Sequence, residues 1–255
     1  MSPPPAPNGA PAQEDDGQWT RVKPKKGTSR RRPAGPGARD FGTPPNPSPQ
    51  LDLQQITRDH DRISAAWRES QCHAKLRDLV NSNVASHVTV TKAVCLAVGS
   101  FDPIATLYHQ KRVAHVQLEA FRAVVEMLEA HNGSPIQRVI QEPAFSDTDK
   151  EFCESLGFKT VDTPQAFEMI DSHTLVYGIH LYMPTWAEAL SKQLPGCLVG
   201  TPFGVCETYH DTHGAGFELA QLQTIDASFD RFPFPQQDTP GDFVFSDTTI
   251  YWAKG

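Results

Sequence analysis

The chain has 255 residues, a formal net charge of −7 and five cysteines. Residues 1–40 carry a net charge of +4, so residues 41–255 carry −11. This acidic charge excludes broad nucleic-acid binding through the folded domain, because phosphate binding needs a basic surface. No run of about twenty apolar residues is present, which excludes a membrane span. The scattered cysteines indicate reduced thiols in the cytoplasm or nucleus rather than a secreted disulfide framework.

The first segment, residues 1–50, is rich in proline, glycine and basic residues and has few large apolar side chains. Such a segment cannot bury enough apolar area to offset the entropy of ordering it, so the sequence predicts a disordered basic tail and linker. Within it, Trp19–Arg32 combines an isolated tryptophan with a basic run. Two interpretations stay open for these residues: a docking peptide that folds on a protein partner, or a bare linker.

The rest of the chain alternates between helical and strand patterns, which predicts a single α/β domain over residues 51–255. A helix over 51–82 is expected to brace the sheet from outside. The uninterrupted apolar run Ala93–Val98 is typical of a central parallel strand that is covered on both faces. The further expected helices are 110–131, 147–156 and 184–194, and the further expected strands are 136–142, 158–161, 173–181 and 197–200.

This alternation indicates a Rossmann-like, doubly wound and mostly parallel sheet with helices on both faces. After Phe203 the pattern weakens, and residues 243–252 are expected to form an edge strand.

Gly99, Ser100 and Phe101 follow the central strand where an open parallel sheet places its ligand crevice, beyond the carboxyl ends of the strands. A dinucleotide fingerprint would need three glycines at fixed spacing, and Gly99 stands alone. Glu142 ends the next strand, a position from which a carboxylate can accept hydrogen bonds from ribose hydroxyls. A ligand crevice and a tight turn without a ligand both remain open, and a nucleotide-type cofactor is compatible with the pattern but not required by it.

Other reactive side chains suggest little chemistry. Cys206, Glu207, His210 and His213 lie close together in sequence, but their spacing is not one of the known zinc spacings, so no metal site is predicted. Cys95 lies in the apolar strand, where burial raises a thiol pKa and makes the thiol inert. No nucleophile elbow, Walker loop or metalloprotease motif is present.

Six motifs in order resemble those of the Sensitivity-to-Red-Light-Reduced-like (SRR-like) family, and a fungal member is expected. They are LAVGSF (96–101), AHVQLEAF (114–121), EPAFSDTDKEFCESLGFKTV (142–161), LYMPTW (181–186), VGTPF (199–203) and FSDTTIYW (245–252). The resemblance implies a Rossmann-like domain and a part in regulation, with family links to circadian timing, haem biosynthesis and stress. It implies no established reaction.

The chain also departs from the family pattern. The family has Asp where this chain has Glu142, and its Tyr-Met-Pro signature continues with His-Cys where this chain has Thr185-Trp186. A regulatory protein that binds partners, with a small ligand as an optional gate, is therefore the first hypothesis. The alternative is a Rossmann-type enzyme with a cofactor such as S-adenosylmethionine, whose crevice would be formed by Gly99, Ser100, Phe101, Glu142, Tyr182, Met183 and Pro184.

Overall fold

A computed structural model describes residues 51–102, 108–213, 219–237 and 242–255 of the chain. The predicted tail, including Trp19–Arg32, lies outside these residues, and the fold concerns the unit that spans Asp40–Gly255. Within the described part of the chain, no helix is both long and apolar enough to cross a membrane.

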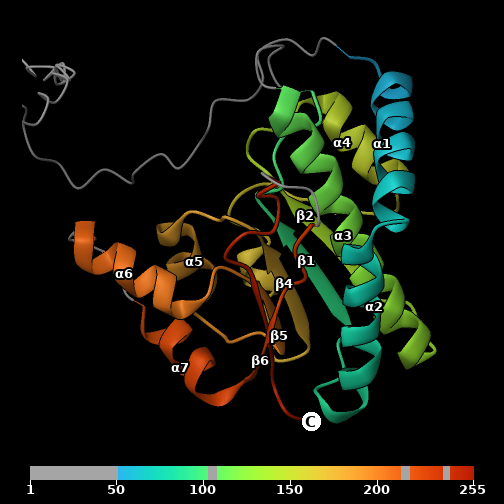
Figure 1. Ribbon diagram of the computed structural model, residues 1–255. Coiled ribbons are helices and arrows are strands. Elements are labelled where there is room, and N and C mark those ends of the chain that lie inside the picture. The colour runs from blue at the N-terminus through green and yellow to red at the C-terminus, as the bar shows by residue number, and fades with distance from the viewer. Residues whose placement is uncertain (1–50, 103–107, 214–218, 238–241) are drawn as a thin grey trace, which may run out of the picture. The chain divides into compact units, whose positions relative to one another are not determined.

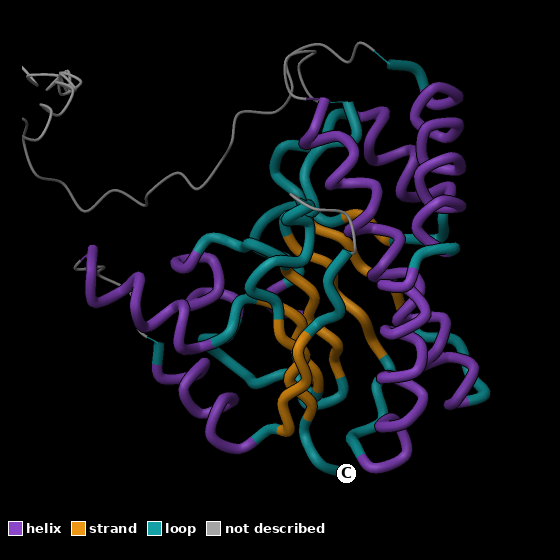
Figure 2. Tube along the Cα trace, viewed as in Figure 1, coloured by secondary structure: helices purple, strands orange, loops and turns teal. Residues whose placement is uncertain are grey.

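The described residues form one seven-stranded sheet in the order β3-β2-β1-β4-β5-β7-β6 (Figures 1 and 2). The five strands from β3 to β5 are parallel, and β7 pairs antiparallel with both β5 and β6. The strands are β1 (Lys92–Leu96), β2 (Gln137–Gln141), β3 (Lys159–Thr160), β4 (Thr174–Gly178), β5 (Cys197–Gly200), β6 (Asp230–Pro233) and β7 (Thr249–Trp252).

Helices cover both faces of this sheet, which confirms the predicted doubly wound α/β class. Figure 1 shows α1 to α4 on one face and α5 to α7 on the other. The helices are α1 (Leu53–Arg68), α2 (Gln71–Asn83), α3 (Tyr108–Asn132), α4 (Asp147–Ser155), α5 (Met183–Ala189), α6 (Phe203–His213) and α7 (Ala220–Ser228), with short 3₁₀ turns at Val84–Ser86 and Phe167–Met169.

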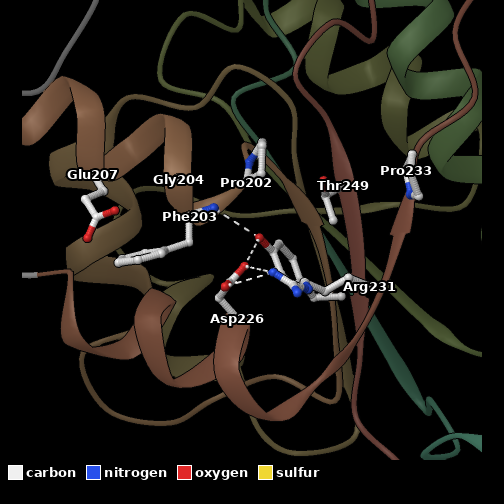
Figure 3. Close-up of a pocket in the computed structure, with 9 residues that line it drawn as sticks. Pro202, Phe203, Gly204, Glu207, Asp226, Arg231, Pro233 and Thr249 are labelled. Atoms are coloured by element: carbon white, nitrogen blue, oxygen red, sulfur yellow. Dashed lines mark hydrogen bonds and ion pairs between the residues drawn. The ribbon is translucent and has the colours of Figure 1, made fainter.

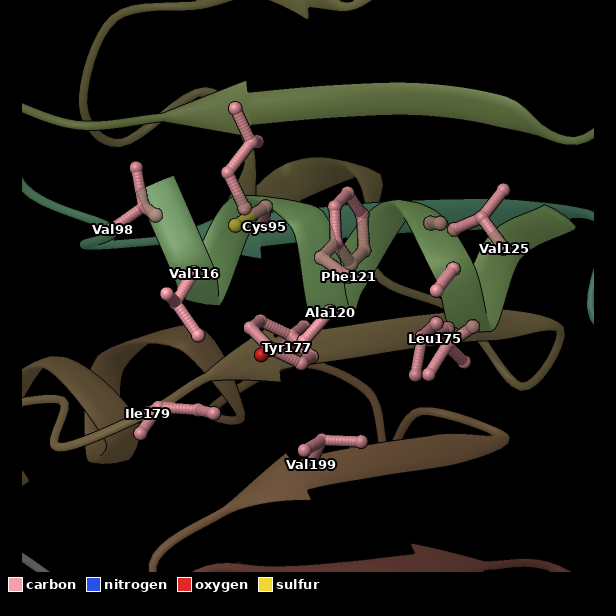
Figure 4. Close-up of a cluster of buried hydrophobic side chains, with 14 of the residues drawn as sticks. Cys95, Val98, Val116, Ala120, Phe121, Val125, Leu175, Tyr177, Ile179 and Val199 are labelled. Carbon is pink, nitrogen blue, oxygen red and sulfur yellow. The ribbon is translucent and has the colours of Figure 1, made fainter. Parts of the chain in front are cut away.

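Two apolar cores lie on the two faces of the sheet, because successive side chains of a strand point to opposite sides. Cys95 of β1 and Tyr177 of β4 pack with Phe121 of α3 in the first core (Figure 4). Val94 and Leu96 pack in the second core, on the side of α5 to α7. All the side chains of β1 after Lys92 are buried, as the apolar run predicts.

The predicted brace helix over 51–82 is two helices, because the chain breaks at Ser70. The backbone of Ser70 is extended, and its Oγ accepts from the N–H of His73 at 3.2 Å and donates to the carbonyl of Trp67 at 2.6 Å. The serine therefore caps α2 while it ends α1. The apolar spacing runs through both helices, so periodicity alone does not reveal the break.

The chain after Phe203 holds more structure than its pattern indicates. In α6, Cys206 is buried while Val205, Glu207 and Tyr209 are exposed, so no apolar stripe marks this helix. The strand expected over 243–252 is present but shorter, and it is β7. The prediction that it forms an edge of the sheet is wrong. It lies between β5 and β6, and β6 forms the edge. The expected helix 184–194 also ends early, at Ala189.

Candidate functional site at the carboxyl edge of the sheet

The strand order reverses at β1, because β2 and β3 are added on one side of it and β4 and β5 on the other. Left-handed backbone follows both β1 and β4 at this point. Ala97, directly after β1, has a φ of 55°, and His180, shortly after β4, has a φ of 54°. Asp247, at 47°, follows Ser246, whose carbonyl oxygen lies 2.9 Å from Nε2 of His180. Left-handed conformations are costly for residues other than glycine and gather at functional sites. These observations single out the carboxyl edge at β1 and β4.

Gly99 and Glu142 are direct neighbours at this edge. Gly99 has a φ of 84°, which favours glycine, and its N–H donates to Glu142 Oε2 at 2.8 Å. The other oxygen of Glu142 accepts from the N–H of Ala144 at 2.8 Å. Burial raises the pKa of Glu142, against the effect of these two hydrogen bonds. The carboxylate is thus engaged in holding the turn after β1.

A second carboxylate, Asp149 at the start of α4, holds the next part of the same turn. It is fully buried and accepts from Ser100 Oγ at 2.8 Å, from the N–H of Phe101 at 3.0 Å and from the N–H of Ser146 at 2.9 Å. Burial raises its pKa, and the hydrogen bonds oppose that shift. Sequence reasoning missed Asp149 as part of the site. The signal was the Ser-x-x-Asp capping box that begins at Ser146.

Phe101 does not line an open crevice. Its side chain is fully buried in the first core, with ring-centroid distances of 5.0 Å to His115, 5.0 Å to Phe152 and 5.5 Å to Phe145. The ring anchors the turn to α3 and α4. Phe101 therefore contributes its backbone and its packing to this edge.

Tyr182, Met183 and Pro184 begin α5 after the β4 exit. Met183 packs against the second core, on the opposite face of the sheet from Phe101. Tyr182 points outward and is 58% exposed. The structure therefore brings Gly99, Ser100, Phe101 and Glu142 into one hydrogen-bonded turn. Tyr182, Met183 and Pro184 follow a different strand, β4, and Met183 packs on the other face of the sheet.

Phe243 adds a second exposed aromatic side chain, at 67% exposure. Its segment is fastened to α3 by an ion pair between Asp242 and Arg112 at 2.9 Å, and its carbonyl oxygen accepts from Ser246 Oγ at 3.1 Å. Ser246 contacts His180, two residues before Tyr182. The His180–Ser246 contact thus joins the two segments that carry Tyr182 and Phe243, which we call the aromatic edge.

Trp186, in the middle of α5, covers the ends of β4 and β5. The indole of Trp186 is fully buried and packs on Gly178 and Gly200, which pair across the ends of β4 and β5. A Cβ atom added at Gly178 would lie 3.1 Å from the indole. The space above these strand ends is therefore filled by apolar packing.

The thiols in and beside these strands are poor nucleophiles. Burial raises the pKa of Cys95 and Cys197 strongly and that of Cys206 to about 11, so all three stay protonated at neutral pH. In the part of the chain that the structure describes, no three His, Cys, Asp or Glu side chains gather as metal ligands would. The side chain of His213 lies outside the described residues.

Comparison with known proteins gives a family match. The model of the SRR1 domain matches residues 72–252, and no curated protein matches the sequence. Two solved structures share 8% and 10% identity: a Thermoplasma acidophilum protein (TM-score 0.36; 77% of this chain, 97% of that chain) and a chain of a methyltransferase-activator complex from Haloferax volcanii (TM-score 0.35; 82% and 100%). Likeness at this level carries no conclusion about function. The SRR1 domain match covers most of the sequence and agrees with the motif order, and this chain belongs to the SRR1 domain family.

Proposed function

We propose that this protein is a regulator that acts by binding a protein partner at the aromatic edge, with a small ligand as an optional gate. Membership of the SRR1 domain family supports a regulatory role in general terms. The observation that carries the proposal is the exposure of Tyr182 and Phe243, on two segments that the His180–Ser246 contact holds together. Aromatic side chains are enriched at the centres of protein interfaces, where they bury much area at little entropic cost.

The chemistry of the turn after β1 also supports binding over catalysis. Both oxygens of Glu142 and both oxygens of Asp149 accept hydrogen bonds from the protein's own groups. A catalytic carboxylate must instead reach the proton of a bound substrate. The departure from the family pattern at Thr185 and Trp186 points in the same direction.

Finer features of the proposal come from the family resemblance and from the tail. We propose circadian timing, haem biosynthesis or stress as the regulated process, and the cytoplasm or nucleus as the location. Trp19–Arg32 would supply a second docking element through its tryptophan and its basic run.

Partner capture with matched variants tests the proposal. The double variant Tyr182→Ser, Phe243→Ser removes the aromatic edge, while Tyr209→Ser removes an exposed tyrosine from α6 as a control. We expect quantitative mass spectrometry to find a reproducible set of proteins that is captured by the wild type and by the control but lost by the double variant. An identical set for all three proteins, with circular dichroism showing intact folds, would contradict the proposal.

A ligand titration separates the regulator from the alternative, an enzyme with a nucleotide-type cofactor. Calorimetry with S-adenosylmethionine, NAD and ATP at millimolar concentration measures whether any of them binds. A bound ligand without turnover would agree with a ligand-gated regulator. Turnover of a nucleotide-type substrate that disappears in a folded Glu142→Ala variant would overturn the regulatory proposal in favour of the enzyme.

A further inference from the structure

The turn that carries Phe243 is fixed from inside the domain. Val244 and Phe245 follow Phe243 and are buried in the first core, where the ring centroid of Phe245 lies 4.7 Å from that of Phe234. The N–H of Ser246 donates to the carbonyl oxygen of Phe243 at 3.2 Å and closes the turn. The residues 243–247, which we call the edge turn, are therefore held in one conformation by the core beneath them.

Side chains from outside the edge turn satisfy its buried carbonyl groups. The amide nitrogens of Gln117 and Gln236 donate to the carbonyl oxygens of Val244 and Phe245, at 3.3 and 2.7 Å. Asp247 ends the turn with a φ of 47°. Left-handed backbone persists at a residue other than glycine only where its surroundings over-determine it, as they do here. The edge turn is thus pre-organised before any partner binds.

Asp247 is an available negative charge on this turn. Its side chain is exposed and makes no hydrogen bond or ion pair with another residue that the structure describes. The carboxylate just before the turn, Asp242, differs in both respects: its side chain is 5% exposed, and it pairs with Arg112 at 2.9 Å and accepts from the N–H of Val244 at 3.2 Å. Since residues 41–255 carry a net charge of −11, the domain has no surplus of cations for Asp247 either.

The edge turn therefore presents an exposed aromatic ring and a free carboxylate four residues apart. The side chain that matches both is arginine, because its planar guanidinium stacks on aromatic faces and pairs with carboxylates through two parallel hydrogen bonds. We infer that the partner docks on the aromatic edge through a basic segment, with an arginine on Phe243 and Asp247 and with Tyr182 against the rest of the segment. This charge complementarity rests on the proposed function and specifies the partner for it.

A pocket at the start of α6 holds a similar pair of side chains and serves as the comparison site. It encloses about 550 Å³ between α6, α7, β6 and β7 (Figure 3). Its cation, Arg231, already donates to both oxygens of Asp226, at 3.1 and 3.0 Å. Glu207 is exposed, and Figure 3 shows the ring of Phe203 between it and that ion pair. No residue of the edge turn lines this pocket, so Glu207 gives a matched control for Asp247.

Two peptides of the same shape test the partner chemistry with the full chain. One alternates serine and arginine, and its twin has citrulline, which lacks the positive charge, in place of each arginine. In amide NMR titrations, we expect the arginine peptide to shift the signals of Phe243, Ser246 and Asp247 with a dissociation constant at least about fivefold lower than that of the twin. Equal affinity of the two peptides would overturn the inference, as would the absence of saturable shifts at millimolar concentration.

Two variants that remove the same charge locate the contact. Asn tolerates left-handed backbone, so Asp247→Asn should keep the edge turn folded while it abolishes the preference for the arginine peptide. Glu207→Gln should leave that preference unchanged. A preference that survives in Asp247→Asn and disappears in Glu207→Gln would overturn the inference, because the basic segment would then bind at the pocket.

Partner capture separates this inference from the proposed function. We expect Asp247→Asn to capture less of the partner set than Glu207→Gln does. Full capture by Asp247→Asn, with loss in the double variant Tyr182→Ser, Phe243→Ser, would overturn the basic chemistry alone and leave the aromatic edge as the partner site. Full capture by both the single and the double variant would contradict the proposed function as well.

Discussion

Gly200 shows at the scale of one residue how closely the end of the sheet is packed. A Cβ atom added there would overlap Cζ2 of Trp186 and would lie 3.1 Å from the carbonyl oxygen of Gly178. Since the indole is fully buried, it has no open space into which it can move. A glycine is needed at position 200 because any larger residue would prevent the indole of Trp186 from packing against β5.

We therefore expect Gly200→Ala to destabilise the protein by about 1–3 kcal/mol, the usual cost of overpacking. The control is Gly204→Ala in the first turn of α6, where an added Cβ meets nothing within 4 Å. Alanine is the better helix former, so the control should be neutral or slightly stabilising. Urea unfolding of both variants makes the comparison, and equal stability of the two would contradict the role of Trp186.

Tyr177 permits the opposite prediction. Its hydroxyl is buried in the first core and has no hydrogen-bond partner among the described residues. An unsatisfied buried hydroxyl costs about 1–3 kcal/mol, so Tyr177→Phe should leave the protein equally stable or stabilise it by up to that amount.

The matched control for Tyr177 is Tyr251→Phe, which removes a hydroxyl with two hydrogen bonds and should destabilise the protein by roughly 1–3 kcal/mol. Thermal unfolding by calorimetry measures both changes. A clear loss of stability in Tyr177→Phe would show that its hydroxyl does have a partner.

At the scale of elements, a buried charge cluster joins α1 to α3. Glu119 of α3 is almost fully buried and pairs with Arg68 of α1, with Arg122 at 2.9 Å and with His60 of α1 at 3.4 Å. Burial alone would raise the pKa of Glu119, but the hydrogen bond with His60 and the charges of Arg122 and Arg68 outweigh it and lower the pKa to about 2. The carboxylate therefore stays ionised and holds two helices together.

This cluster predicts a loss of stability in acid. The native state binds a proton on Glu119 more weakly than the unfolded chain, whose carboxyl titrates near 4.5. The stabilisation is complete above about pH 4.5 and is lost as the pH falls toward 2, with a total near 3 kcal/mol. Urea unfolding between pH 6 and pH 3 measures this change.

Glu119→Gln isolates the contribution of the cluster. The variant should be less stable than the wild type by about 3–5 kcal/mol at pH 6, because two arginines lose a buried counter-charge, and the difference should shrink at pH 3. Glu126→Gln, which removes a half-exposed partner of the same arginines, should show a much smaller effect. A difference that stays constant with pH would rule out the assigned pKa shift.

At the scale of the whole molecule, α1 packs on the first core although the family match begins after it, at residue 72. Ile56, Ile63 and Trp67 of α1 are buried in the first core. Each such side chain contributes about 1.5–3 kcal/mol, and together they approach the total stability of a typical domain.

Two truncations test this domain boundary. A chain of residues 51–255 should melt cooperatively within a few degrees of the full chain, because the tail has too little apolar surface to pack. A chain of residues 71–255 lacks α1 and should lose its cooperative thermal transition. Circular dichroism melts measure both, and a cooperative fold in the shorter chain would make α1 an accessory element.

The pattern of neighbouring residues was enough to predict the strand β1, the turn at Gly99 and the doubly wound class. A strand that is buried on both faces is an uninterrupted apolar run, and a parallel α/β sheet shows strand patterns that alternate with helical ones. The proximity of Glu142 to Gly99 also followed, since neighbouring parallel strands end at one edge. Three features did not follow from the sequence. The break at Ser70 is hidden because the apolar spacing continues through it, and α6 is hidden because few of its residues are buried. The inner position of β7 depends on its antiparallel pairing with β6, which the residues of β7 alone do not reveal.

The sequence by itself determined the class of fold, the carboxyl edge as the place of the candidate site and, through its motifs, the SRR1 domain family. Only the tertiary structure decided how the carboxylates are used: Asp149 and Glu142 hold the turn after β1, and Tyr182 stands beside another strand. It also brought Glu207, Asp226 and Arg231 around one pocket. The physical reason is that consecutive residues carry the burial pattern of a strand or a helix. Hydrogen bonds and charge pairs between distant segments depend instead on strand register and on how the helices pack, which many distant residues determine together.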